Sequence, residues 1–178
     1  MTRFRRTPGT AGRHSTGESG QALVELALVA PLLILLLVAI FQFAFVFQTQ
    51  MGITNAVREA ARRAAAVENP DETWVRTQLC GDPSCTTGLL AENVQGFSLA
   101  RLQGGSANVL FCTYVVSSIP QYRVIVGVAY DHPEFFPLAQ IAALAAGKPS
   151  GGAWNWTING EAEMRMEHDL TTSPGGCP

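Results

Sequence analysis

The sequence predicts an α+β protein in which a long N-terminal helix crosses a membrane and continues into a small domain with an antiparallel β-sheet. Three observations support this class: an uncharged apolar run, an alanine-rich helical continuation, and strict period-two alternation in the C-terminal half. The length of 178 residues allows one modest domain with an appendage. We therefore expect a basic leader at 1–20, a helix at 21–67 and an outer α+β domain at 68–178.

The apolar run, Leu26 to Phe47, is 22 residues long, and Gln42 is its one strongly polar member. A helix of this length rises ~33 Å, which is enough to cross a ~30 Å hydrocarbon core. A secretory signal peptide fits poorly because its apolar region is shorter and a cleavage motif follows it. A simple signal anchor fits the length but leaves one feature, Glu25 at the mouth of the run, without a role.

The charges on either side of this run differ in sign. Residues 1–20 carry a net charge of +3, the remaining residues carry −5, and the chain as a whole carries −2. The positive-inside rule therefore keeps 1–20 in the cytoplasm and places residues after about 48 outside the plasma (inner) membrane. A net charge this close to neutral argues against nucleic acid as the main partner.

The residues around Glu25 form the string G-QALVE, in which Gly20 precedes Gln21 and the glutamate is the fifth residue after the glycine. This string resembles the cleavage site of type IV prepilin-like proteins. The longer string, with Pro31 early in the span and an alanine- and arginine-rich continuation at 55–66, resembles the TadE-like pseudopilins of tight-adherence (Tad, or Flp) pilus systems. One position departs from the family, because Leu26 stands where Tad pseudopilins often carry an aromatic residue.

The resemblance implies that a prepilin peptidase cuts between Gly20 and Gln21, and that Glu25 pairs with the N-terminus of a neighbouring subunit during assembly. The partners implied are membrane lipid, other pilins or pseudopilins, and the inner-membrane machinery of the Tad system. The alternative for Glu25 is a side chain that reaches the cytoplasmic headgroups. Pro31 removes one helical hydrogen bond, so it predicts a kink that serves extraction from the membrane or is harmless.

Beyond the span, two stripes with a four-residue repeat predict a smooth helix face on which a sheet can pack: Ala56, Ala60 and Ala64, and Val57, Ala61 and Ala65. Glu59 precedes Arg62 and Arg63 in the order that favours surface ion pairs, and we interpret this as a solvated face. Pro70 ends the helix. Short helices are expected at 71–80 and within 85–95.

Three strands are expected. Residues 108–117 and 121–130 predict a hairpin closed by SSIP, in which alternate residues from Tyr122 to Tyr130 share one face. Residues 154–166 alternate between an apolar and a polar side, and Gly160 interrupts them, which suggests a bulge. The apolar face should pack on the alanine stripe, which is a pilin-like architecture.

All four cysteines, Cys80, Cys85, Cys112 and Cys177, follow the span, which fits an oxidising compartment and allows three complete pairings. We favour Cys80 with Cys85 and Cys112 with Cys177. A zinc site is the alternative, but the paired short CxxC motifs of such sites are missing.

Evidence for catalysis is thin. DHPE at 131–134 and EHD at 167–169 could suggest a metal site, but strand direction would put them at opposite ends of the sheet. We prefer Asp131 and Glu134 as a capping box before the apolar run 135–146. The sequon at Asn155 falls within a predicted strand, and we interpret it as chance. We expect no enzyme, no metal and no cofactor, because no phosphate-binding loop, nucleophile elbow or catalytic triad is recognisable.

Two functions compete at this stage. The first is a minor pilin or pseudopilin that is processed after Gly20 and takes part in assembly of a Tad pilus. The alternative is a permanently anchored extracytoplasmic binding domain that recognises a ligand or the cell wall and keeps its leader, and adhesion fits either function.

Overall fold

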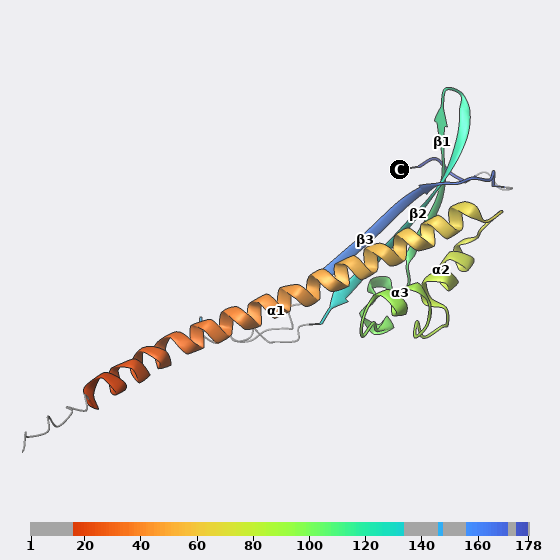
Figure 1. Ribbon diagram of the computed structural model, residues 1–178. Coiled ribbons are helices and arrows are strands. Elements are labelled where there is room, and N and C mark those ends of the chain that lie inside the picture. Colours follow the sequence, from red (N-terminus) through yellow and green to blue (C-terminus); the bar gives the residue numbers. More distant parts are fainter. Residues whose placement is uncertain (1–15, 134–145, 148–155, 171–173, 178) are drawn as a thin grey trace, which may run out of the picture. The chain divides into compact units, whose positions relative to one another are not determined.

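The structure is a computed structural model, and it describes residues 16–133, 146–147, 156–170 and 174–177. The chain divides into two units, Met1–Ala39 and Ile40–Pro178, and helix α1, Thr16–Ala66, passes through the boundary between them. The second unit is α+β. In Figure 1 its strands lie beside the later half of α1, as the sequence predicts.

Helix α1 begins at Thr16, which is earlier than the predicted residue 21. At its other end α1 stops at Ala66, because Asn69 adopts a left-handed backbone (φ 52°) just before Pro70. Helix α1 is long and apolar enough to cross a membrane, and its most apolar window is not buried within the protein.

The sheet has three antiparallel strands in the order β1-β2-β3, namely β1 (Asn108–Val116), β2 (Ile119–His132) and β3 (Trp156–Arg165). The turn of the predicted hairpin is tighter than expected. Val116 pairs with Ile119, so only Ser117 and Ser118 form the turn, with φ values of 50° and 68°. Positive φ at both central residues matches the twist of a two-residue hairpin.

The core of this unit lies between the sheet and the later half of α1. Every member of the predicted alanine and valine stripes is buried. They share one cluster with Ile53 of α1, with the alternate residues of β2 from Val124 to Tyr130, and with Ile158 and Ala162 of β3. The predicted inner faces of β2 and β3 are therefore confirmed, and small side chains on α1 allow the sheet to approach closely.

Gly160 does not form the predicted bulge. The register between β2 and β3 is continuous, and Gly160 pairs with Val128. A Cβ at this position would lie 2.5 Å from Cγ2 of Ile53 on α1. Gly160 is therefore needed for close approach of helix and strand rather than for a break in the ladder.

The described part of this unit also contains two short helices, α2 and α3. Helix α2, Glu72–Cys80, is capped by Asp71, whose carboxylate accepts a hydrogen bond from the backbone of Trp74 at 2.6 Å. Helix α3, Gly88–Asn93, packs its end against α1, where a Cβ at Gly52 would lie 2.3 Å from the carbonyl oxygen of Asn93. The 3₁₀ turns η1, Leu99–Arg101, and η2, Gln103–Gly105, lead into β1.

Both favoured disulfides, Cys80–Cys85 and Cys112–Cys177, are present in the structure, so no cysteine is left to bind zinc. The second bond holds the tail against β1. The backbone N–H of Thr113 donates to the carbonyl of Gly175, and the N–H of Cys177 donates to the carbonyl of Thr113. The tail thus covers part of an otherwise open strand edge.

Candidate functional site

The predicted processing and assembly residues lie on one exposed helical segment. Gly20, Gln21 and Glu25 all belong to α1, and all three are exposed. Apart from the adjacent residues and the backbone of the helix itself, nothing in the described part of the chain lies within 4 Å of where a Cβ on Gly20 would sit. Gln21 and Glu25 are four residues apart, so they occupy neighbouring positions on one side of the helix. If the chain were cut after Gly20, the new amine at Gln21 would lie near the Glu25 carboxylate of its own chain. Because both residues are exposed, the amine would also be accessible to another chain.

Pro31 lies inside α1, and the helix continues through it. A proline here cannot donate to the carbonyl of Ala27, so one backbone acceptor in the apolar run lacks its helical partner. Neighbouring helices can satisfy such a carbonyl in a membrane. Pro31 is exposed, which leaves this side of the helix open to such a neighbour.

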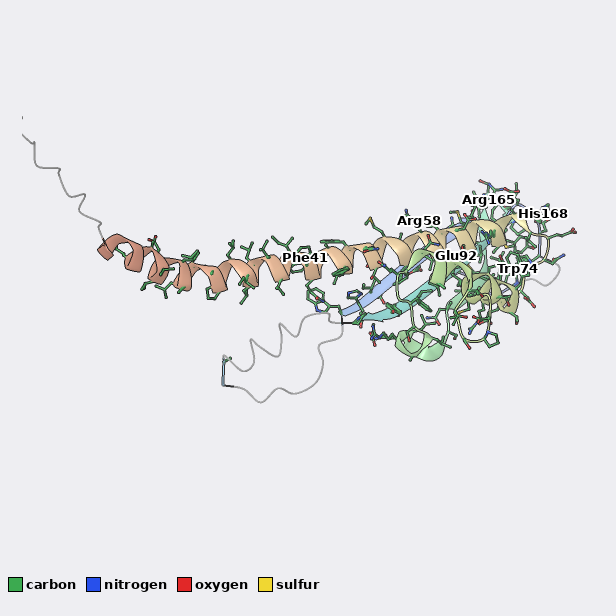
Figure 2. The ribbon with its side chains drawn as sticks, turned by 60° about the horizontal axis from the view of Figure 1, so that its bottom comes forward. Phe41, Arg58, Trp74, Glu92, Arg165 and His168 are labelled. Atoms are coloured by element: carbon green, nitrogen blue, oxygen red, sulfur yellow. A yellow bond between two sulfur atoms is a disulfide. The ribbon has the colours of Figure 1, made fainter. Side chains whose placement is uncertain are left out.

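The apolar run presents large side chains on every side of the helix. Figure 2 shows these side chains projecting around the earlier part of α1. An exposed apolar surface of this extent marks a membrane or protein contact. Leu23 and Val24, just before the run, are at least 45% exposed, as are these members of the run: Leu26, Leu28, Val29, Leu32, Leu33, Ile34, Leu35, Leu36, Leu37, Ile40, Phe41, Phe43 and Phe47.

The comparison with protein families supports the resemblance carried by these residues. A family model described as TadE-like protein matches residues 20–62. This segment of the chain is TadE-like. The match begins at Gly20, contains Glu25 and Pro31, and ends at Arg62 within the buried half of α1, and it associates the chain with Tad pilus systems. No curated protein and no solved structure matches the chain.

The TadE-like match leaves the sheet, the cysteines and the tail outside its bounds. The family is not an enzyme family, and a single long apolar helix fits a membrane anchor. Within the described part of the chain no group of three or more His, Cys, Asp or Glu side chains could hold a metal ion. Asp131 and His132 of the DHPE motif lie at the end of the sheet opposite to the EHD motif, because His132 pairs with Trp156 whereas Arg165 pairs with Arg123.

The proposed capping box cannot be evaluated, since Glu134 and most of 135–146 lie outside the described residues, as does Asn155 of the sequon. Asp131 itself belongs to β2, which extends past the predicted end at Tyr130. Its carboxylate accepts hydrogen bonds from Gln103 and from Thr157, each at 2.9 Å. These contacts tie η2 and β3 to the end of β2.

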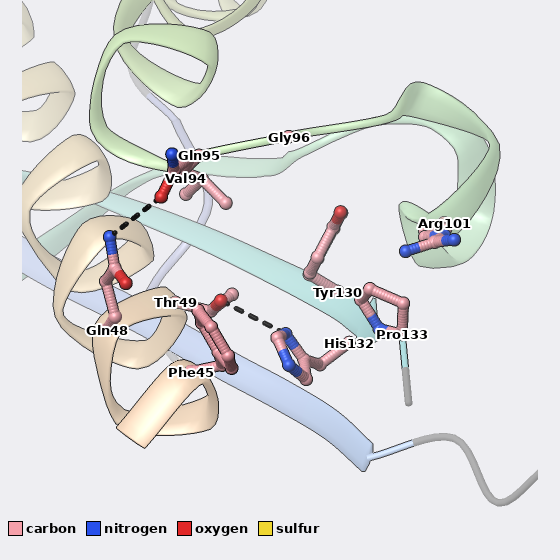
Figure 3. A pocket seen from close by; sticks show the side chains of 10 residues that line it. All are labelled: Phe45, Gln48, Thr49, Val94, Gln95, Gly96, Arg101, Tyr130, His132 and Pro133. Atoms are coloured by element: carbon pink, nitrogen blue, oxygen red, sulfur yellow. Dashed lines mark hydrogen bonds between the residues drawn. The ribbon is translucent and has the colours of Figure 1, made fainter. Parts of the chain in front are cut away.

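A pocket of about 590 Å³ that sequence reasoning missed lies at this same end of the sheet. Figure 3 shows its walls, which come from α1, from the segment after α3, from η1 and from the end of β2. The hydroxyl of Thr49 lies 3.1 Å from Nδ1 of His132, and the amide of Gln48 donates to Gln95 at 3.4 Å. Tyr130 forms the buried floor and stacks on Phe97 with centroids 5.1 Å apart.

Burial of His132, together with the nearby positive charge of Arg101, lowers the pKa of this imidazole. The ring is therefore neutral at pH 7. Its burial extends the inward-facing alternation of β2 by one more residue. The separation of 83 residues between Thr49 and His132 explains why no local pattern indicated the pocket.

The predicted ion pairs on the later half of α1 are present. Glu59 accepts from Arg62 at 2.8 Å and from Arg63 at 2.9 Å. These hydrogen bonds lower the pKa of Glu59 to about 2. The side chains are partly or largely exposed, which fits the interpretation of a solvated helix face rather than a functional site.

Proposed function

We propose that the protein is a minor pilin or pseudopilin that takes part in assembly of a Tad (Flp) pilus after a prepilin peptidase removes residues 1–20. The observation that carries this proposal is the TadE-like match, which spans Gly20, Gln21 and Glu25 on a helix whose apolar side chains the protein leaves exposed. Residues 1–20 face the cytoplasm in this scheme, and the sheet-bearing unit lies outside the plasma membrane.

The exposed apolar side chains of α1 favour association with other helices, but they do not fix the axial position of one helix against another. Apolar side chains on every side of α1 can pack in many rotational and axial positions, because contacts between them are permissive. A single carboxylate changes this. In lipid the carboxylate of Glu25 is stabilised most by a nearby positive charge, and cleavage would create one at the amine of Gln21. Pairing of Glu25 with the amine of another subunit would select one axial position.

Cleavage is tested by mass spectrometry of the protein isolated from membranes of cells that contain an active prepilin peptidase. We expect loss of residues 1–20 and a new N-terminus at Gln21. Gly20→Lys should abolish the cut, since the family's enzymes need a small residue before the bond. Gly17→Lys, which adds the same charge to the leader three residues earlier, is the matched control and should still be cut.

The role of Glu25 is tested by Glu25→Gln, which keeps the shape of the side chain and removes its charge. Incorporation into pili should fall strongly while the amount in the membrane is retained, because a neutral amide is easier to insert than a carboxylate. Glu18→Gln changes the same residue type within the leader and should have no effect. Equal incorporation of wild type and Glu25→Gln would refute the pairing.

The alternative, a permanently anchored extracytoplasmic binding domain, is favoured by the pocket beside β2, because a pocket of this size suits a ligand. The N-terminus separates the two functions. If the protein keeps its full leader while the peptidase demonstrably cuts another pilin in the same cells, the anchored domain is correct and the assembly function is not.

A further inference from the structure

The end of the sheet lies beside the last turn of the apolar run. Phe43, within that run, meets Trp156 of β3 edge to face, with ring centroids 5.9 Å apart. Trp156 is the first residue of β3 and is 41% exposed. Its partner across the ladder is His132, the last residue of β2. This end of the sheet is therefore placed where the apolar run of α1 gives way to polar residues.

Tryptophan is enriched at the boundary between hydrocarbon and water, where its apolar rings and its N–H group are both accommodated. A half-exposed tryptophan against the end of a membrane-crossing run has the chemistry of such an anchor. The three residues that follow Phe47 are Gln48, Thr49 and Gln50, so the polar side of the boundary begins there.

The pocket of about 590 Å³ opens at this level, because Phe45, Gln48 and Thr49 of α1 line it. Arg101 lines the opposite wall, which η1 supplies (Figure 3). No described residue that lines the pocket is a carboxylate, and Arg101 has no ion-pair partner within the part of the chain that the structure describes. Among the described residues that line the pocket, the positive charge of Arg101 is therefore not paired with a carboxylate.

We propose that this pocket binds the phosphate-bearing headgroup of an anionic phospholipid from the membrane that α1 crosses, with Arg101 contacting the phosphate and Trp156 anchoring the end of the sheet at the membrane surface. A lipid reaches the pocket directly, since its acyl chains can lie along the apolar side chains of α1 while its headgroup enters the pocket. The proposal rests on membrane insertion of α1 but not on cleavage or pilus assembly.

The lipid is tested with the full chain in detergent, to which phosphatidylglycerol and phosphatidylcholine of identical acyl chains are added in equal amounts. Bound lipid is counted by native mass spectrometry. Wild type should prefer phosphatidylglycerol, and Arg101→Gln should lower that preference roughly fivefold, the loss expected for one arginine at an anionic lipid surface. Arg101→Lys, which keeps the charge, should retain most of it.

Arg58→Gln is the matched control, because Arg58 is an exposed arginine on α1 that does not line this pocket. It should bind both lipids as wild type does. Excess inorganic phosphate should not displace phosphatidylglycerol. Equal binding of the two lipids by wild type, an equal loss in Arg58→Gln, or displacement by phosphate would each overturn the proposal, the last in favour of a site for free anions.

The position of Trp156 is tested independently with the full chain in nanodiscs that contain brominated lipid. One variant keeps only Trp156, through Trp74→Phe and Trp154→Phe, and the other keeps only Trp74. Figure 2 shows Trp74 at the end of the unit away from Phe41. Bromine quenches nearby indoles, so we expect strong quenching of Trp156 and little of Trp74. Equal quenching of the two would contradict the anchor.

Discussion

Helix α1 is one continuous element, yet its two halves carry different side chains and meet different surroundings. In the earlier half the residues are mostly leucine, valine and phenylalanine, and many are more than half exposed. In the later half, from Ile53 to Ala65, the inward residues are mostly alanine and are fully or almost fully buried under the sheet and the short helices.

The difference shows how partner geometry selects side-chain size. Lipid and neighbouring helices adapt to a bulky surface, so large side chains gain the most buried apolar area there. A sheet within the same chain has a fixed position, and only small residues allow close backbone approach. Gly52 and Gly160 are the extreme cases, because a Cβ at either position would force neighbouring atoms to move.

Deleting the apolar half of α1 alone, or both halves together, should give the largest difference in folding. A fragment starting at Gln50 keeps the buried half and every strand, so we expect it to be soluble and to show the circular dichroism of a folded α+β protein when oxidised. A fragment starting at Val67 loses the stripes that form one side of the core and should not fold. A random-coil spectrum from the purified, oxidised 50–178 fragment would show that the apolar half is required for folding.

An alanine-to-leucine substitution in each half of α1 should give a smaller difference, in this case in the free energy of unfolding. Ala60→Leu adds three carbons to a fully buried position and should lower the free energy of unfolding by about 1–3 kcal/mol, because overpacked cores force side chains and backbone to move. Ala27→Leu makes the same change at an exposed position of the apolar half. Urea unfolding of the full chain in detergent should give the wild-type midpoint for Ala27→Leu.

Two strand glycines, Gly160 and Gly127, differ in how closely other atoms approach them, so the same substitution should change stability differently at each. Gly160→Ala should destabilise the protein by about 1 kcal/mol, because the new methyl group meets Ile53 and the strain exceeds the usual gain from replacing a strand glycine. Gly127→Ala adds the same group on β2, where the nearest atom is 3.9 Å away, and should be neutral or slightly stabilising. Reversal of this order in thermal unfolding would disprove the close approach of Gly160 to α1.

The smallest effect concerns pH. Folding lowers the pKa of His132, so below about pH 6.5 the unfolded chain binds a proton that the folded chain resists. The contribution of this residue is therefore full above pH 6.5 and is lost as the pH falls toward the folded pKa, by roughly 1.4 kcal/mol for each unit of the shift. His132→Gln should flatten the decline in stability between pH 7 and 5, as measured by urea unfolding at each pH.

Periodicity and composition were enough to predict most of the fold. The period-two pattern assigned the inward faces of β2 and β3, the alanine repeat identified the helix face beneath them, and Pro70 explained where α1 ends. These features are local, because each depends on residues close together in the chain. The start of α1 was not predicted as well, because the helix was expected from residue 21, directly after the proposed cleavage site, whereas it begins at Thr16.

The parts that could not be predicted depend on contacts between distant segments. Gly160 in a strand is compatible with a bulge or with close approach, and only the position of Ile53 decides between them. The sequence motif DHPE suggested a strand end, whereas Thr49 on α1 and the ladder with β3 hold His132 within β2. The assembly segment was recognisable because its residues are consecutive, but the pocket gathers four separate segments.

The Cys112–Cys177 bond also changes the covalent topology of the outer unit. It closes a macrocycle over a sequence separation of 65 residues, and β2 and β3 both lie within it. A protease that cuts one peptide bond between Thr113 and Gly176 therefore opens the macrocycle without dividing the molecule. A subunit nicked there outside the cell migrates as two pieces only after reduction, and until then its anchor and its strands remain one covalent body.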